Sequence, residues 1–390
     1  MVRNQSANTT SLLTLIACSV VLILILYVQG ALTRNYIGLH YLLADRYILG
    51  KPSGSQLWDA AMLELHPRLH LWLAQDAFQA GDLPQAETLL QPLLATPNNL
   101  MIEAERLLGR LWAQQGRWED AVAVWRTSGD AHALVEAGLQ AQADAQLVQA
   151  LTAFEAADQV NPSVGKSPLA TFLWRTMQEP GEAAALLRAG IDSQPDSSQR
   201  RQWLSQLGAL YQDQQQWQQA IEVYEALHQL MPNEAAPLIQ LGWSHYQAGD
   251  GAAVALAQFQ LATSVAPGDG AGYLAIGQLL VTEKEFGAAD PWFARAVAQA
   301  PTNLSWQLAY IGNARDNGQL DAAIDRSQQA LQALPNAHQL YFALSALWLE
   351  NGQPTRAETP LMKALALAGE AAPAAYQQQL EKIQTALGKQ

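Results

Sequence analysis

Two histidines, His66 and His70, stand four residues apart in the segment HPRLH. On a helix this spacing places both imidazoles on one face, where they could bind a metal ion. Pro67 lies between them, however, and no acidic third ligand is apparent nearby. The pair is therefore better explained as ordinary residues at the start of a helix, and we predict neither a metal site nor a cofactor.

The segment PGDGAGY, from Pro267 to Tyr273, has glycines at alternate positions. Such a loop can cradle phosphate groups when it connects a strand to a helix. No strand is predicted upstream, so a turn is the better interpretation. The hydrolase, zinc-protease and P-loop patterns GxSxG, HExxH and GxxxxGK are absent. Because the acidic residues are also scattered at spacings typical of solvated helix faces, we predict that the protein is not an enzyme.

Composition excludes several other classes of function. Hydrophobic residues make up 49% of the 390 residues and charged residues 15%, which is not the composition of a disordered chain. The formal net charge is -13, from 35 acidic and 22 basic residues, and the sequence contains no block of Lys and Arg. Nucleic-acid binding is therefore not expected. The single cysteine, Cys18, excludes an intrachain disulfide framework.

A short tail, residues 1–10, precedes an uncharged apolar run at residues 11–33. About 23 residues in a helix span roughly 34 Å, enough to cross a bilayer core. We therefore predict one transmembrane helix. The alternatives are a signal peptide cleaved near Gly30, a lipoprotein signal ending at Cys18, and a buried core helix. The run is long for a signal peptide, and its most apolar part follows Cys18, where a lipoprotein should become polar.

Basic residues give a weak indication of which side of the membrane the chain occupies. Arg3 precedes the span, whereas Arg34, Arg46 and Lys51 follow it, which does not favour the usual cytoplasmic N-terminus. A short tail before a single span, on the other hand, is typical of an ordinary signal anchor. We favour an extracytoplasmic soluble part and leave the cytoplasmic alternative open. Residues 34–55 form a tyrosine-rich juxtamembrane segment that ends in the linker KPSGS.

Beyond this linker the sequence repeats. An alanine followed four residues later by a bulky residue recurs with a period of about 34 residues. The alanines are Ala121, Ala150, Ala220, Ala255, Ala289, Ala323 and Ala357, although Ser327 and Leu361 take the place of the aromatic residue in the last two units. Prolines recur with a similar spacing. Each unit has the pattern of two helices, a Leu-Gly pair with an aromatic residue on the first and the alanine with its aromatic residue on the second.

These markers resemble the tetratricopeptide repeat family, whose pattern is W-x2-L-G-x2-Y, then A-x3-F, then P. The segment LGALYQDQQQWQQAIEVYEALHQLMP, Leu207 to Pro232, matches it almost throughout. The resemblance covers residues 66 to 369 and implies an all-α, right-handed solenoid of about nine repeats, which we place at residues 56–369. An amphipathic segment at residues 370–390 is expected to cap the last repeat. The unit near Pro195 lacks the Leu-Gly pair and carries Pro180, so a bend or a looser joint is expected there.

The resemblance implies a protein-binding function rather than catalysis. We expect a membrane-tethered scaffold or assembly factor that holds a partner polypeptide near the bilayer. A structural subunit of a stable membrane complex is the first alternative, and an enzyme or regulatory component a remote one. In the family the first helix of each repeat lines the concave surface, which implies an apolar groove for an extended apolar segment or an amphipathic helix. The implied binding residues are Ile239, Trp243, Tyr246, Leu274, Val281, Leu308, Phe342 and Leu349.

Trp243 and Tyr246 have two interpretations. They could form a binding hot spot, in which case Trp243→Ala is expected to cost about 2 kcal/mol of binding free energy and leave the melting temperature nearly unchanged. Alternatively they pack between repeats. The sequence alone leaves both possibilities open.

Overall fold

A computed structural model describes residues 67–95, 100–193 and 196–388. These residues form 19 α-helices and one short 3-10 helix, and no strand occurs among them. The predicted all-α class is therefore confirmed for the described part of the chain. In the same ranges no helix is both long and apolar enough to cross a membrane. The transmembrane helix predicted at residues 11–33 lies outside the described residues.

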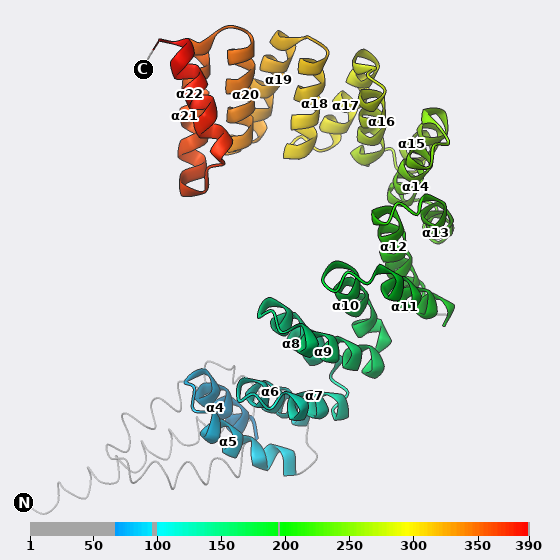
Figure 1. Ribbon diagram of the computed structural model, residues 1–390, viewed down its shortest axis with the longest axis vertical. Helices are drawn as coiled ribbons and strands as arrows, with labels where there is room; N and C mark the ends of the chain where they lie inside the picture. The colour runs from blue at the N-terminus through cyan, green and yellow to red at the C-terminus, as the bar shows by residue number, and fades with distance from the viewer. Residues whose placement is uncertain (1–66, 96–99, 194–195, 389–390) are drawn as a thin grey trace, which may run out of the picture. The chain divides into compact units, whose positions relative to one another are not determined.

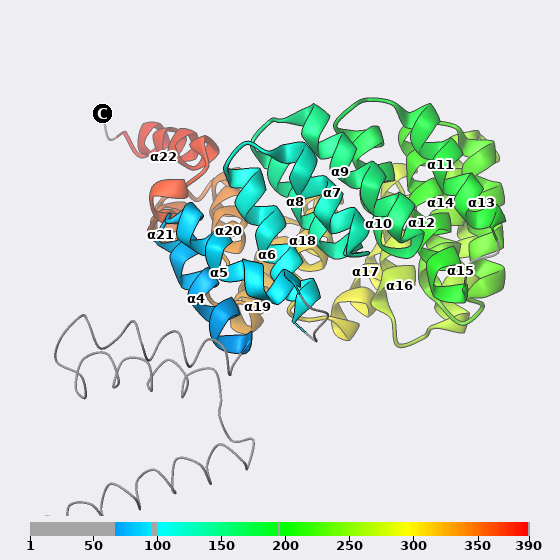
Figure 2. The ribbon, with the colours of Figure 1, turned by 90° about the horizontal axis from the view of Figure 1, so that it is seen from below.

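The chain divides into two compact units, Met1–Gly165 and Lys166–Gln390. In unit 1 consecutive helices pair through short connections and lie side by side (Figures 1 and 2). These helices are α4 (Pro67–Gln79), α5 (Leu83–Ala95), α6 (Met101–Gln114), α7 (Trp118–Thr127), α8 (Ala131–Ala143) and α9 (Leu147–Val160). The division falls within α10 (Pro162–Arg175), the first helix of the repeat that lacks the Leu-Gly pair.

Unit 2 continues the same pairing of helices (Figure 1). Its further helices are α11 (Pro180–Asp192), α12 (Ser197–Asp213), α13 (Trp217–Leu230), α14 (Ala235–Ala248), α15 (Ala252–Val265), α16 (Gly270–Thr282), α17 (Phe286–Gln299), α18 (Leu304–Asp316), α19 (Leu320–Ala333), α20 (His338–Glu350), α21 (Pro354–Ala368), the 3-10 helix η2 (Gly369–Ala371) and α22 (Ala374–Ala386). The first helices of neighbouring pairs contact each other directly, α14 with α16 and α18 with α20. Within each of these two sets the first helices therefore lie side by side.

The periodic residues of the sequence form the contact inside each helix pair. All seven marker alanines are fully buried. The aromatic residue that follows them packs on the glycine of the first helix: a Cβ atom added to Gly208 would lie 2.6 Å from Tyr224 Cζ. The same contact joins Gly109 with Trp125, Gly138 with Phe154, Gly242 with Phe259, and Gly277 with Phe293. Glycine is needed at this place because a ring occupies the space of its side chain.

In one repeat the large and the small residue of this contact exchange places between the two helices. Ser327 replaces the aromatic residue on α19, and Ile311 stands on α18 where the preceding repeat has Gly277. Both residues are buried, with 0% and 3% of their surface exposed. A large residue on the first helix thus accompanies a small one on the second, and such an exchange keeps the total volume between two helices roughly constant.

Helix α22 lies within the segment predicted to cap the last repeat. It packs against α20 and α21, and its Tyr376 and Ile383 are buried. Tyr376 Oη lies 2.7 Å from His338 Nδ1, and the Tyr376 ring stacks on Phe342 with 4.3 Å between the ring centroids. The α20 surface that would otherwise face solvent is therefore partly covered. The boundaries at residues 56 and 369 stay predictions.

Candidate partner-binding surfaces

The eight residues implied as a binding surface lie on the first helices of four successive pairs in unit 2, α14, α16, α18 and α20. We call this set, defined above from Ile239 to Leu349, the apolar row. Each of its members is half-buried, which means that each both packs against the protein and keeps a face toward solvent. Ile239, Leu274, Leu308 and Phe342 take the same place in the first helices of successive pairs, so the row recurs with the repeat.

Trp243 and Tyr246 both contact other residues of unit 2. The Trp243 ring lies 5.1 Å from the Phe259 ring and 6.1 Å from the Tyr246 ring, measured between centroids. Tyr246 Oη donates a hydrogen bond to Glu283 Oε1 at 2.6 Å. This hydrogen bond to a carboxylate is the main cause of a raised pKa at Tyr246. The two side chains therefore have a packing role, and their half-exposed surface leaves a binding role open to test.

The middle of α18 carries a glycine that the packing of unit 2 does not require. A Cβ atom added to Gly312 would meet no atom within 4 Å, in contrast to the paired glycines described above. Gly312 follows Leu308 by four residues and therefore lies on the same helix face. The surface of α18 beside the apolar row is thus open.

A second surface, which sequence reasoning missed, is a cleft of about 490 Å³ in unit 1. We call it the α8 cleft, because α8 supplies more of its lining than any other helix. Its lining residues are Phe78 of α4; Arg110, Ala113 and Gln114 of α6; Trp118 and Trp125 of α7; Ala133, Glu136, Ala137, Gln140 and Ala141 of α8; Asp144 just after α8; and Gln146 and Gln149 at the start of α9. Small and amide side chains predominate, so the cleft combines an apolar interior with neutral hydrogen-bonding groups.

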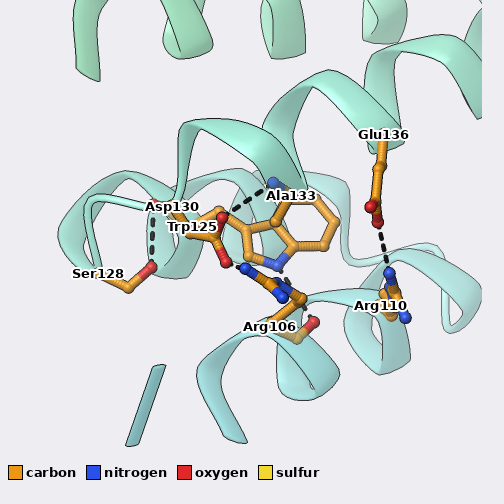
Figure 3. Close-up of polar contacts among 7 residues, drawn as sticks. All are labelled: Arg106, Arg110, Trp125, Ser128, Asp130, Ala133 and Glu136. Carbon is orange, nitrogen blue, oxygen red and sulfur yellow. Dashed lines mark hydrogen bonds and ion pairs between the residues drawn. The ribbon is translucent and has the colours of Figure 1, made fainter. Parts of the chain in front are cut away.

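A polar network fixes α8 against α6 at one side of this cleft (Figure 3). Asp130 Oδ1 accepts a hydrogen bond from the backbone N–H of Ala133 at 3.0 Å and so caps the start of α8. Its Oδ2 accepts a hydrogen bond from Arg106 Nε at 2.7 Å. Trp125 Nε1 donates to the Arg106 carbonyl oxygen at 3.2 Å, which fixes the indole ring below the cleft.

The charges of the network are arranged in two ion pairs. Burial alone would raise the pKa of Asp130, but the hydrogen bonds from Arg106 and from the Ala133 N–H outweigh burial, and the pKa is lowered. Asp130 is therefore ionised at neutral pH. A second pair joins Arg110 to Glu136 at the cleft wall (Figure 3). Both arginines of α6 thus bind carboxylates of unit 1.

Two motifs that resemble metal and phosphate sites occupy different structural contexts. His70 is buried, and the other histidine of HPRLH, His66, lies outside the described residues. No cluster of three or more His, Cys, Asp or Glu side chains suited to a metal ion occurs in the described part of the chain. In the PGDGAGY segment, Gly270 begins α16 and follows α15 instead of a strand. A Cβ atom at Gly270 would lie 2.3 Å from Trp306, so packing explains this glycine.

Pairs of helices that repeat with one period, and that pack through alanine, glycine and aromatic residues, define a helical-repeat protein. The family model described as tetratricopeptide repeat matches residues 71–127 and 239–303, which correspond to α4 to α7 and to α14 to α17. This match supports the predicted tetratricopeptide repeat family. No curated protein matches the chain.

Several solved structures resemble parts of the chain. MamA from Desulfovibrio magneticus RS-1 is 18% identical and has a TM-score of 0.36, with 44% of this chain and 96% of MamA covered. YrrB, described as a TPR protein with an unusual peptide-binding site, is 16% identical and has a TM-score of 0.36, with 51% of this chain and 99% of YrrB covered. A tetratricopeptide repeat protein from Parabacteroides merdae is 15% identical, has a TM-score of 0.42, and covers 65% and 98%. These likenesses concern the fold alone.

Proposed function

We propose that this protein is a scaffold or assembly factor that binds a partner polypeptide along the apolar row and is held at the membrane by residues 11–33. The observation that carries the proposal is the uniform half-burial of the eight residues of the row. A side chain that served packing alone could be fully buried, as Leu238 and Leu241 are on the same helix α14. Instead, an apolar strip on four successive helices keeps contact with water, which is unfavourable unless a partner covers it.

The column of residues in the middle of this surface suggests how the partner lies. The residues that take equivalent places in the four helices are Trp243, Gln278, Gly312 and Ala346, so the side chains become shorter toward α18 and α20. A partner chain can therefore approach the helix backbone more closely at α18 than at α14. An extended apolar segment or an amphipathic helix fits such a surface, because either presents a continuous row of side chains.

Site-specific crosslinking tests the binding surface. We expect a photo-crosslinking amino acid at position 312 to give a discrete crosslinked product in native membranes, because a side chain there points into open space. The matched control places the same amino acid at Asp325, which is exposed on the second helix α19. The products are compared by immunoblotting and mass spectrometry. Equal crosslinking at the two positions would exclude the apolar row as the binding surface.

Membrane attachment and sidedness require a separate experiment. We expect the intact protein to stay in the membrane pellet after a carbonate wash, because residues 11–33 are uncharged and apolar. A reporter fused after Gln390 is expected to be active only in its exported form. Release of the protein by the wash would instead support cleavage near Gly30. Protection of the soluble part from external protease in intact cells would reverse the proposed sidedness.

A further inference from the structure

The α8 cleft exists because one repeat lacks two bulky residues. In α6, Leu108 precedes the paired glycine, Gly109, and Trp112 follows that glycine by three residues. In α8 the corresponding residues around Gly138 are Ala137 and Ala141. The register of the comparison is secure, since a Cβ atom on Gly138 would lie 2.7 Å from Phe154, just as one on Gly109 would meet Trp125.

The missing side chains leave space that the rest of unit 1 does not fill. Ala137 and Ala141 both line the α8 cleft, and Trp125, with only 1% of its surface exposed, forms part of its base. A buried side chain shortened to alanine costs stability when its neighbours cannot close the gap. The cleft is also of the size at which proteins bind ligands, which is about 300–1,000 Å³. An open space of this size, lined by small side chains where other repeats have larger ones, is suited to binding.

The charges around the cleft favour a basic partner. Residues 67–165 contain twelve Asp and Glu residues against five Arg and no Lys. Arg110, the cation of the cleft wall, already lies against Glu136. Asp144, which follows the end of α8 and lines the cleft, accepts a hydrogen bond from the neutral amide of Gln140 at 3.0 Å, and no ion pair joins it to another of the described residues. A cationic group of a ligand would therefore be attracted to this end of the cleft, and a second carboxylate would be repelled.

We propose that the α8 cleft binds a partner polypeptide through one bulky apolar side chain, aromatic or leucine, with a basic residue beside it in the partner. The anchor side chain takes the volume that a leucine and an aromatic residue occupy in α6, α12 and α20, and contacts Trp118 and Trp125. The basic neighbour reaches Asp144. The exposed amides of Gln114 and Gln146 flank the anchor and can exchange hydrogen bonds with the main chain of the partner. This site is independent of the apolar row, which lies in unit 2.

Binding of short labelled peptides to the full-length protein in detergent tests the proposal. The probe is acetyl-Gly-Lys-Trp-Lys-Gly with a fluorophore at its C-terminus, measured by fluorescence anisotropy. Two matched peptides replace Trp with Ser, or both Lys with Glu. We expect each replacement to weaken binding by roughly tenfold, because the first removes the anchor and the second reverses the charge. Equal binding of the three peptides, or no measurable binding of the first, would overturn the proposal.

A variant whose cleft is filled by larger side chains distinguishes an effect on peptide binding from an effect on protein stability. The variant Ala137→Leu with Ala141→Tyr introduces the residues that flank Gly208 in α12, Leu207 and Tyr211. We expect it to lose at least tenfold in affinity for the Lys-Trp-Lys peptide while its melting temperature is kept or raised. The control Ala143→Leu, at an exposed position of α8, is expected to change neither quantity. Unchanged affinity in the filled variant would show that the peptide binds elsewhere.

Two further measurements identify the occupant and cover the case of a filled variant that melts early. Asp144→Asn removes only a charge. It is therefore expected to weaken binding of the Lys-Trp-Lys peptide and not to weaken binding of the peptide in which both Lys are replaced with Glu.

If the Lys-Trp-Lys peptide binds only after residues 1–66 are deleted, the cleft holds a segment of the same chain, and the proposed partner is excluded. If the wild-type protein dimerises and the filled variant does not, the cleft belongs to a second copy, which also overturns the proposal.

Discussion

Replacing Gly242 with alanine is expected to lower the free energy of unfolding by about 2–3 kcal/mol, although the change adds a single methyl group. The added Cβ atom would lie 2.4 Å from Cε1 of Phe259, a ring that is fully buried between α14 and α15. The ring has no open space in which to move, so the two helices must separate or the ring must leave its preferred rotamer. Denaturant titration of the full-length protein, followed by circular dichroism, measures the loss.

Gly312→Ala is the matched control, because it makes the same change in the interior of another first helix. A Cβ atom at Gly312 meets nothing within 4 Å, so no clash opposes the better helix propensity of alanine. We expect this variant to gain about 0.5–1 kcal/mol of stability. If both variants lose the same amount of stability, packing of a ring on Gly242 does not explain why glycine is needed there, and helix propensity does not decide the effect at Gly312. If Gly242→Ala is neutral, the helix pairs are less tightly packed than the structure indicates.

These two glycines illustrate what the sequence could and could not predict. The period, the two helices per repeat and the buried alanines were predictable, because each alanine and its bulky neighbour recur where helices must approach closely. The partner of the aromatic residue was not predicted. The sequence places the ring one turn after the alanine, but the residue that the ring contacts is the glycine of the preceding helix. Only the three-dimensional pairing of two helices shows this contact.

The α8 cleft was missed for a different reason. Its lining carries no pattern of catalytic or metal-ligating residues. The available signal was an absence, since Ala137 and Ala141 stand where α6, α12 and α20 have a leucine and an aromatic residue. A cavity results only if neighbouring helices do not close over the small side chains, which the sequence does not specify.

Helical spacing decides which residues share a face, so the sequence could group the members of the apolar row, which lie on α14, α16, α18 and α20. Its degree of burial was not predictable. Phe342 follows the same spacing as Leu308, yet its ring stacks on Tyr376 of α22, more than 30 residues further along the chain. Partner binding must therefore be tested for each member of the row separately. Trp243 is a suitable first test, because its ring contacts with Phe259 and Tyr246 are known.

Trp243→Ala is expected to weaken partner binding and also to destabilise the protein. The binding loss is expected to be about 2 kcal/mol if the half-exposed indole is a hot spot. Because the ring also packs on Phe259 and Tyr246, its removal is also expected to lower the free energy of unfolding by about 2–3 kcal/mol. The melting temperature should therefore fall, whereas the hot-spot interpretation of the sequence alone left it nearly unchanged.

A control of similar instability separates the two effects. Phe293→Leu shortens a ring that is 2% exposed on the second helix α17, and it leaves the apolar row unchanged. Affinity for the partner crosslinked at position 312 is measured for both variants well below their melting temperatures. We expect Trp243→Ala to bind at least tenfold more weakly than Phe293→Leu, since only the former removes a side chain that faces the partner. If the two variants bind equally well, Trp243 serves packing alone, and the partner must contact other residues of unit 2 or another surface of the protein.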